Sequence, residues 1–266
     1  MTRPVFLAPP EILEEALPGQ RLVLEGDEAR HALQVRRLHA GEEIDLVDGA
    51  GRRVSGPITE TSGSGATSRL SMTVTTVTQE PAPRPRLVLA QALAKGGRDE
   101  QAITMACEAG IDEVIPWQAR HSIVRWQGAR AAKGRARWEA ALLAAVKQSR
   151  RAWLPPVGEL HTSLAEVAAR AVSGGGAALL LDEQAITPIA HAELPATDAQ
   201  APPAQVVLIV GPEGGISDEE RRELITAGAQ PVRLGPHVLR SGTAGVIATA
   251  VVSQQLGRWE PNTSSE

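Results

Sequence analysis

A glycine-rich loop near the C-terminal end of the chain follows directly after an apolar run. Residues Val206–Val210 have the composition of a buried strand, and the loop Gly211-Pro212-Glu213-Gly214-Gly215 comes next. A helix is predicted after the loop, with Ser217 as its N-cap and acidic residues in its first turn. In parallel sheets, ligands bind where loops leave the carboxyl ends of strands, and glycines let the backbone approach a ligand. The pattern therefore predicts a ligand site.

Two phosphate-binding motifs do not fit this loop. A Walker-type loop ends in Gly-Lys followed by Ser or Thr, and this segment contains no lysine. The dinucleotide fingerprint GxGxxG has a different glycine spacing. The nearby acids Glu213, Asp218 and Glu219 would also repel phosphates. Taken alone, the loop is equally compatible with a purely structural turn.

A second loop strengthens the case for a ligand. Residues 232–244 again leave a short predicted strand and enter a helix rich in Ala and Val. Leu234 and Leu239 supply apolar surface, and Arg240 supplies a cation. Two such loops suit a ligand with a flat apolar ring and polar edges.

Together the two loops resemble the knotted (SPOUT) methyltransferases, and specifically the RsmE family. The resemblance is carried by VGPEGG at 210–215 and by LGPxVLRxxTA at 234–244. It extends over most of the chain through weaker matches, which are Lys95–Glu100 with Glu108–Gly110, Gln148–Arg151 with Pro155–Val157, and His31–Arg37 with Gly41 and Asp48-Gly49. The last group resembles the family's N-terminal β-barrel domain of the PUA type.

The resemblance implies an architecture. It implies an α/β fold in which residues 80–266 form a parallel-sheet domain with a deep trefoil knot, an exception to the usual rules of chain connection. Residues 1–79 would form the smaller PUA-type β-barrel, which contacts RNA. It also implies a homodimer.

The resemblance further implies an activity and a cofactor. Members of the family transfer a methyl group from S-adenosylmethionine to N3 of a uridine in 16S ribosomal RNA of the small subunit, near the decoding region. In related enzymes the adenine of the cofactor is held by backbone groups of the crossing loops. Carried to this chain, the cofactor-binding positions are Leu181, Gly211, Pro212, Glu213, Gly214, Leu234, Gly235, Leu239 and Thr243.

Methylation at uridine N3 needs a way to handle the proton on that nitrogen. The site must remove the proton or stabilise the resulting anion with positive charge or hydrogen-bond donors. Arg240 is the candidate catalytic residue for this role, and the alternative is a salt bridge to Glu213. His237 is either a base or a surface histidine, and no general base stands out. His237 and Gly242 depart from the family pattern, which commonly has Arg and Glu there.

Basic residues concentrate in the middle of a chain whose net charge is −4. Between Arg120 and Arg151, Glu139 is the sole acid. Such a span can neutralise phosphates whatever the total charge, although it could also be a solvated helix face. The predicted RNA-binding residues are Arg30, Arg36, Arg37, Lys95, Arg120, Arg125, Arg150 and Arg151.

The elements around these motifs change character at the Pro-rich stretch 80–85. Before it, short alternating runs predict strands at 5–7, 21–24, 43–47, 53–55 and 68–77, with one helix opening at Asp27 as N-cap. After it, strands are predicted at 87–92, 113–116, 177–181, 206–210 and 231–234, and helices at 99–109, 130–149, 164–172, 218–227 and 243–256. A surface loop is predicted at 198–203. Alternating apolar strands and helices favour a parallel sheet covered on both faces.

Several other classes of protein are disfavoured. Cys107 is the single cysteine, so an internal disulfide and a Cys-based zinc site are excluded, and the six histidines lack the spacing of a metal site. No metal is therefore expected. No apolar run reaches the roughly 18 residues of a membrane span, and Met1–Pro10 does not look like a signal peptide, so a cytoplasmic protein is expected. A catalytically silent RNA-binding assembly factor on the same fold is the alternative function.

Overall fold

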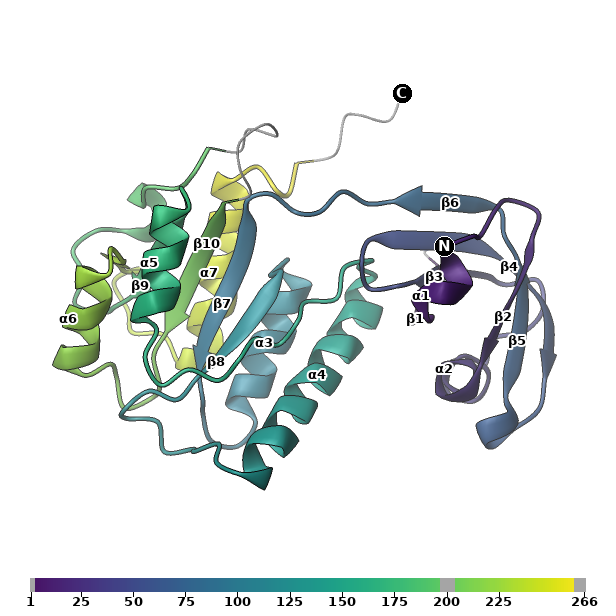
Figure 1. Ribbon diagram of the computed structural model, residues 1–266, viewed down its shortest axis with the longest axis horizontal. Coiled ribbons are helices and arrows are strands. Elements are labelled where there is room, and N and C mark those ends of the chain that lie inside the picture. Colours follow the sequence, from purple (N-terminus) through teal and green to yellow (C-terminus); the bar gives the residue numbers. More distant parts are fainter. Residues whose placement is uncertain (1–2, 197–203, 261–266) are drawn as a thin grey trace. The chain divides into compact units, whose positions relative to one another are not determined.

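The computed structural model describes residues 3–196 and 204–260, and their contacts divide the chain into two compact units (Figure 1). The N-terminal unit comprises residues 1–82 together with 146–154, and the C-terminal unit comprises 83–145 and 155–266. The expected boundary at residue 80 lies close to the first junction. The return of 146–154 to the N-terminal unit had no counterpart in the sequence prediction. The loop predicted at 198–203 lies outside the described residues.

The N-terminal unit is built on a six-stranded sheet with the order β1-β3-β4-β5-β2, in which β6 also pairs with β4. Its strands are β1 Val5–Leu7, β2 Arg21–Glu25, β3 Glu43–Val47, β4 Arg52–Ser62, β5 Arg69–Thr73 and β6 Thr76–Gln79. The first part of the long strand β4 pairs with β3 and β6, and its part from Ile58 onward pairs with β5. The pairing with β5 shifts register between Ile58 and Glu60. The hydrophobic core of the N-terminal unit includes the buried side chains of Phe6, Leu13, Ile44, Leu46, Val54, Leu70 and Met72.

The helix of this unit begins earlier than predicted. Helix α2 spans Gly26–Arg30, its N-cap is Glu25, and Asp27 lies in its first turn and not at the cap. The reason is that Gly26, with a φ of +72°, turns the chain directly out of β2. The helix continues as one π-helical segment, η1 His31–Val35. Two shorter elements are α1 Pro10–Leu13 and the 3₁₀ turn η2 Gly65–Thr67.

The described part of the C-terminal unit contains a five-stranded sheet with the order β11-β9-β10-β7-β8, and all its pairings are parallel. The strands are β7 Arg86–Ala92, β8 Glu113–Trp117, β9 Ala177–Leu181, β10 Gln205–Val210 and β11 Gln230–Val232. The predicted parallel α/β sheet is therefore confirmed. Strand β11 ends two residues earlier than expected, which leaves Leu234 in the following loop.

Helices cover both faces of this sheet (Figure 1). They are α3 Arg98–Glu108, α5 Ala165–Ser173, α6 Asp218–Thr226 and α7 Ser241–Gln255, with a 3₁₀ turn η3 Ile189–His191. The long helix α4 Ala129–Ser149 belongs to this unit up to residue 145, and its last four residues belong to the N-terminal unit. On one face, Ala168 of α5 and Leu224 of α6 join the core formed by Val207 and Ile209. On the other face, α3 and α7 pack together and against β7 and β10. No helix of the described residues has both the length and the apolar character needed to cross a membrane.

Helix α6, which leaves the glycine-rich loop, has the predicted N-cap. Ser217 Oγ accepts a hydrogen bond from the Glu220 N–H at 3.3 Å, and Glu220 Oε2 accepts one from the Ser217 N–H at 3.0 Å. This reciprocal capping box satisfies two N–H groups that the helix itself leaves unpaired.

Ser217→Ala should lower the free energy of unfolding by about 1 kcal/mol, because it removes the cap. Urea denaturation followed by tryptophan fluorescence measures the change. Ser173→Ala, which removes an exposed hydroxyl at the end of α5, serves as the matched control. Equal stability of the two variants would contradict the capping role.

Candidate functional site

A cleft of about 710 Å³ opens in the C-terminal unit at the carboxyl ends of β9 and β10. Three segments contribute most of its lining: the end of β9 and the residues after it, the glycine-rich loop after β10, and the segment entering α7. The lining residues are Arg98, Leu180–Gln184, Val210–Ile216, Asp218, Arg221, Val238–Ser241 and Ala244. The two loops singled out in the sequence are therefore brought to one cavity.

Close packing fixes the glycine-rich loop. A Cβ atom at Gly211 would lie 2.5 Å from Cγ1 of Ile216, and one at Gly214 would lie 3.0 Å from Cβ of His121. The Nδ1 atom of His121 is 3.1 Å from the Gly214 carbonyl oxygen and 3.2 Å from that of Gly215. Gly211 thus allows Ile216 to pack back on the loop, Gly214 allows the segment after β8 to approach, and His121 contacts the GPEGG backbone.

A buried carboxylate fixes the end of β9. Asp182 Oδ2 accepts a hydrogen bond from Arg221 of α6, and Asp182 Oδ1 accepts one from the Gln184 N–H at 2.9 Å. The Asp182 N–H donates to the Val232 carbonyl of β11 at 2.9 Å. One residue therefore connects two strands and a helix at the base of the cleft.

The helix α7 begins two residues before the predicted Thr243. Arg240 is its N-cap in extended conformation, and its carbonyl accepts hydrogen bonds from the N–H groups of Thr243 and Ala244. No side chain caps this end of the helix, so the sequence held no cap signal at Arg240, and Ser241 and Gly242 form the first turn before Thr243. Ser241 in its first turn lines the cleft, and its buried Oγ has no hydrogen-bond partner among the described residues.

The structure brings most of the predicted cofactor positions together. Leu181, Gly211, Pro212, Glu213, Gly214 and Leu239 line the cleft, as does the catalytic candidate Arg240. Leu234, Gly235 and Thr243 do not line it and lie in the adjoining loop and helix turn. His237 is exposed and also outside the lining.

The ion pair of Glu213 at the cleft differs from the one considered in the sequence analysis. Glu213 Oε1 is 3.0 Å from Nη1 of Arg98, at the start of α3. Arg240 is exposed and forms no ion pair with any residue that the structure describes. The alternative role of Arg240, a salt bridge to Glu213, is therefore replaced by the Arg98 pair, and Arg240 keeps an uncompensated charge at the cleft.

Asp99 lies next to this pair and is buried. Burial raises the pKa of the Asp99 carboxyl, while hydrogen bonds from the N–H groups of Glu100 and Ala94 act in the opposite direction. Asp99 does not line the cleft. In the described ranges, no group of three or more His, Cys, Asp or Glu side chains could hold a metal ion.

The predicted RNA-binding residues are distributed over both units. Arg30, Arg36, Arg37, Arg150 and Arg151 belong to the N-terminal unit, and Lys95, Arg120 and Arg125 belong to the C-terminal unit. Some of these cations have partners within the protein: Arg30 pairs with Asp27, and Arg120 pairs with Glu219. Arg37 and Arg150 are, among the described residues, the two non-glycine positions with positive φ, at 57° and 60°.

Comparisons with known proteins show the family of this chain. An RNA methyltransferase domain matches residues 80–253, and an RNA methyltransferase PUA domain matches residues 24–71. Ribosomal RNA small subunit methyltransferase E of Mycobacterium tuberculosis and that of Mycobacterium bovis are each 41% identical over 248 residues, 92% of this chain and 91% of theirs. The chain belongs to the RsmE family. The RsmE structure from Neisseria gonorrhoeae, bound to S-adenosyl methionine, is 27% identical with a TM-score of 0.77, covering 96% of this chain and 98% of that one.

Within the RsmE pattern, the departure at Gly242 has a local consequence. A Cβ at Gly242 would lie 3.4 Å from the carbonyl oxygen of Arg98, so a Glu side chain here would start beside Arg98. In this chain Glu213 of the GPEGG loop supplies the carboxylate next to that arginine.

Sequence reasoning missed several residues of the site. Arg98 and Ser241 lie inside segments that carried the RsmE resemblance, so those segments could have suggested them. His121, Asp182 and Arg221 act through contacts between distant parts of the chain, and no local pattern marks them.

Proposed function

We propose that this protein transfers a methyl group from S-adenosylmethionine to N3 of a uridine in 16S ribosomal RNA, near the decoding region. The observation that carries the proposal is the cleft in which the GPEGG loop, the end of β9 and the entry to α7 meet. Membership of the RsmE family and the S-adenosyl methionine bound to the Neisseria gonorrhoeae relative support it. We also propose a cytoplasmic location, because the proposed substrate is ribosomal.

The cleft residues fit S-adenosylmethionine. The volume of the cleft, about 710 Å³, falls within the range of roughly 300–1,000 Å³ that is typical of small-molecule sites. Leu181, Val238 and Leu239 offer apolar surface to an adenine ring, and the unpartnered Ser241 Oγ offers a hydrogen bond. Backbone groups of Gly211–Gly214 complete the expected contacts, with Leu234, Gly235 and Thr243 as further proposed positions.

The chemistry asks the protein mainly for positioning and charge. When bound, S-adenosylmethionine supplies the methyl group on a sulfonium that is already activated. The loops would hold the acceptor nitrogen in line, an effect of orientation. Arg240 would stabilise the negative charge that develops on the uracil as N3 loses its proton, because its guanidinium is at the cleft and unpaired.

We propose three structural properties along with this function. The chain is knotted at α7, which follows β11 at one edge of the sheet yet packs on β10 and β7, and its Gln255 donates to the Ala190 carbonyl at 2.8 Å. The N-terminal sheet closes as a PUA-type barrel that contacts RNA, together with the basic residues named above. The protein works as a homodimer.

A silent RNA-binding assembly factor is the second candidate. The RsmE resemblance would allow it, but RNA binding alone gives no reason to keep an open cleft lined by GPEGG. Calorimetric titration with S-adenosylmethionine separates the two, because the silent protein would show no binding heat.

Gly214→Val should abolish S-adenosylmethionine binding and leave a folded protein, because the added side chain meets His121 and displaces the loop. Calorimetry measures the affinity, and circular dichroism checks the fold. Gly242→Ala, where a Cβ has 3.4 Å to its nearest neighbour, is the control and should bind as wild type does. Wild-type affinity of Gly214→Val would remove the GPEGG loop from the cofactor site.

Arg240→Ala should slow methyl transfer by about 10² to 10³, the typical loss for a donor that acts mainly in the transition state. Cofactor affinity should stay within a few-fold, and raising the pH should partly restore the rate, because more uridine is then deprotonated unaided. Rates with 16S ribosomal RNA across pH provide the measurement. Arg233→Ala, the other cation of residues 232–244 and outside the cleft, should react normally. A variant of Arg240 that lost the cofactor instead would make it a binding residue.

The homodimer is expected because Val246, Ile247 and Val251 of α7 stay partly exposed in the single chain. Sedimentation at micromolar concentration should show twice the monomer mass. A monomer there would count against the proposed assembly.

A further inference from the structure

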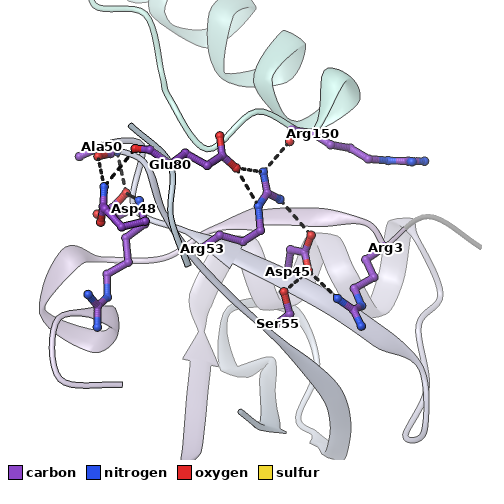
Figure 2. A network of polar contacts seen from close by, with 10 residues as sticks. Arg3, Asp45, Asp48, Ala50, Arg53, Ser55, Glu80 and Arg150 are labelled. Atoms are coloured by element: carbon purple, nitrogen blue, oxygen red, sulfur yellow. Dashed lines mark hydrogen bonds and ion pairs between the residues drawn. The ribbon is translucent and has the colours of Figure 1, made fainter. Parts of the chain in front are cut away.

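A half-buried arginine of the N-terminal unit, Arg53, reaches the chain just after α4. Arg53 of β4 donates from Nε and Nη2 to Glu80 Oε1, at 3.0 and 2.6 Å, and from Nη1 to Asp45 Oδ2 at 2.9 Å. Its Nη2 also donates to the carbonyl oxygen of Arg150 at 2.9 Å (Figure 2). One planar guanidinium thus contacts two carboxylates and one backbone carbonyl.

The electrostatics of Arg53 favour this fixed position. Burial by itself would lower the pKa of Arg53, but the hydrogen bonds and charges of Glu80 and Asp45 outweigh it, so the pKa is raised. Asp45 is itself held by a hydrogen bond from Ser55 Oγ at 2.7 Å. The donor that faces the Arg150 carbonyl is therefore permanently charged and has little freedom to move.

Arg150 adopts a backbone conformation that its residue type disfavours. It directly follows α4 with a φ of +60°, the left-handed position after a helix that glycine usually occupies. Its side chain is exposed and extends away from the Arg53 network (Figure 2). Glycine would adopt this backbone conformation at a lower conformational energy than arginine does. The presence of arginine here therefore indicates that its side chain has a function. Arg37, also predicted to bind RNA, has the same feature after η1.

We infer that Arg53 is a positioning residue: by binding the Arg150 carbonyl it holds the left-handed backbone and directs the Arg150 guanidinium toward RNA phosphate. The inference rests on the proposed RNA contact of Arg150. It assigns to Arg53 a role in RNA binding without any contact to RNA. Lysine cannot replace Arg53 in this role, because a single ammonium group cannot donate at once to Asp45, Glu80 and the Arg150 carbonyl as the planar guanidinium does.

The rest of the 146–154 segment is held independently of Arg53. The Gly51 N–H donates to the Ala152 carbonyl at 3.1 Å, and the Leu154 N–H donates to the Gly49 carbonyl at 2.9 Å. A Cβ at Gly51 would lie 2.7 Å from the ring of Trp153, so this glycine allows close packing. Loss of Arg53 should therefore release the turn at Arg150 and not detach the segment.

A double-mutant cycle on the full-length protein tests the inference. The affinity for a 16S ribosomal RNA transcript is measured over a series of salt concentrations for wild type, Arg53→Lys, Arg150→Gly and the double variant. Arg150→Gly removes the side chain but suits the left-handed backbone, so its melting temperature should not fall. Loss of one phosphate contact should weaken binding about five- to eightfold at 0.1 M salt and flatten the salt slope by about 0.7 to 0.9.

Arg53→Lys should reproduce much of this loss in the wild-type background and add none in the Arg150→Gly background. Additive losses would overturn the inference, because Arg53 would then act by another route. Wild-type RNA affinity of Arg150→Gly would overturn it as well and would remove Arg150 from the RNA surface. That result would leave the proposed methyl transfer intact, since calorimetry with S-adenosylmethionine and the Arg240 rates test it separately.

Two further variants keep the test decisive. If Arg53→Lys does not fold, Glu80→Gln takes its place in the cycle, because it weakens the hold on Arg53 and leaves Asp45 in position. Arg69→Lys alters an exposed arginine of the same unit, paired with Glu25 at 3.2 Å, and should change neither affinity nor slope.

Discussion

The register of the parallel sheet in the C-terminal unit is the constraint on which the site depends. Leu181 at the end of β9 pairs with Val210 of β10 on one side and with Val232 of β11 on the other. The loops that leave these three strands therefore start at the same level and lead into one cleft. A shift by one residue would turn every side chain to the opposite face and would separate the GPEGG loop from the segment entering α7.

Charge distribution at the cleft follows from that arrangement. Three arginines line the cleft. Arg221 is paired with Asp182 and Arg98 with Glu213, whereas Arg240 forms no ion pair with any described residue. A fully paired Arg240 would have to break its ion pair before meeting a developing anion, whereas the unpaired side chain needs no such rearrangement. The N-terminal unit has a similar pair of arginines: Arg53 is hydrogen-bonded to Asp45, Glu80 and the Arg150 carbonyl, whereas the Arg150 side chain extends away from this network (Figure 2).

Local patterns in the sequence predicted the elements well because strand and helix periodicity is a local property. The strands 5–7, 43–47 and 177–181 were predicted with the bounds that the structure has. The starts of α2 and α7 were each predicted two residues late, because neither helix begins with a side-chain cap that a local pattern could mark. The strand–loop–helix pattern pointed to the two loops, and the family resemblance supplied nine predicted cofactor positions, of which six line one cleft.

The parts that sequence reasoning missed are long-range contacts. His121 holds the GPEGG backbone, Asp182 binds Arg221, and residues 146–154 belong to the N-terminal unit. Each depends on which distant segments meet after folding, and an isolated His or Asp carries no mark of its partner. The same holds for Arg53, which looks like an ordinary strand residue until its three acceptors are seen together.

The central claim is that this chain methylates N3 of one uridine in 16S ribosomal RNA. It is tested most directly by mass-spectrometric mapping of 16S ribosomal RNA from a strain lacking the protein, before and after the gene is restored. The account predicts that one N3-methyluridine near the decoding region is missing from the deletion strain and returns on complementation. Unchanged methylation in the deletion strain, or a missing methyl group on a different atom, would contradict it.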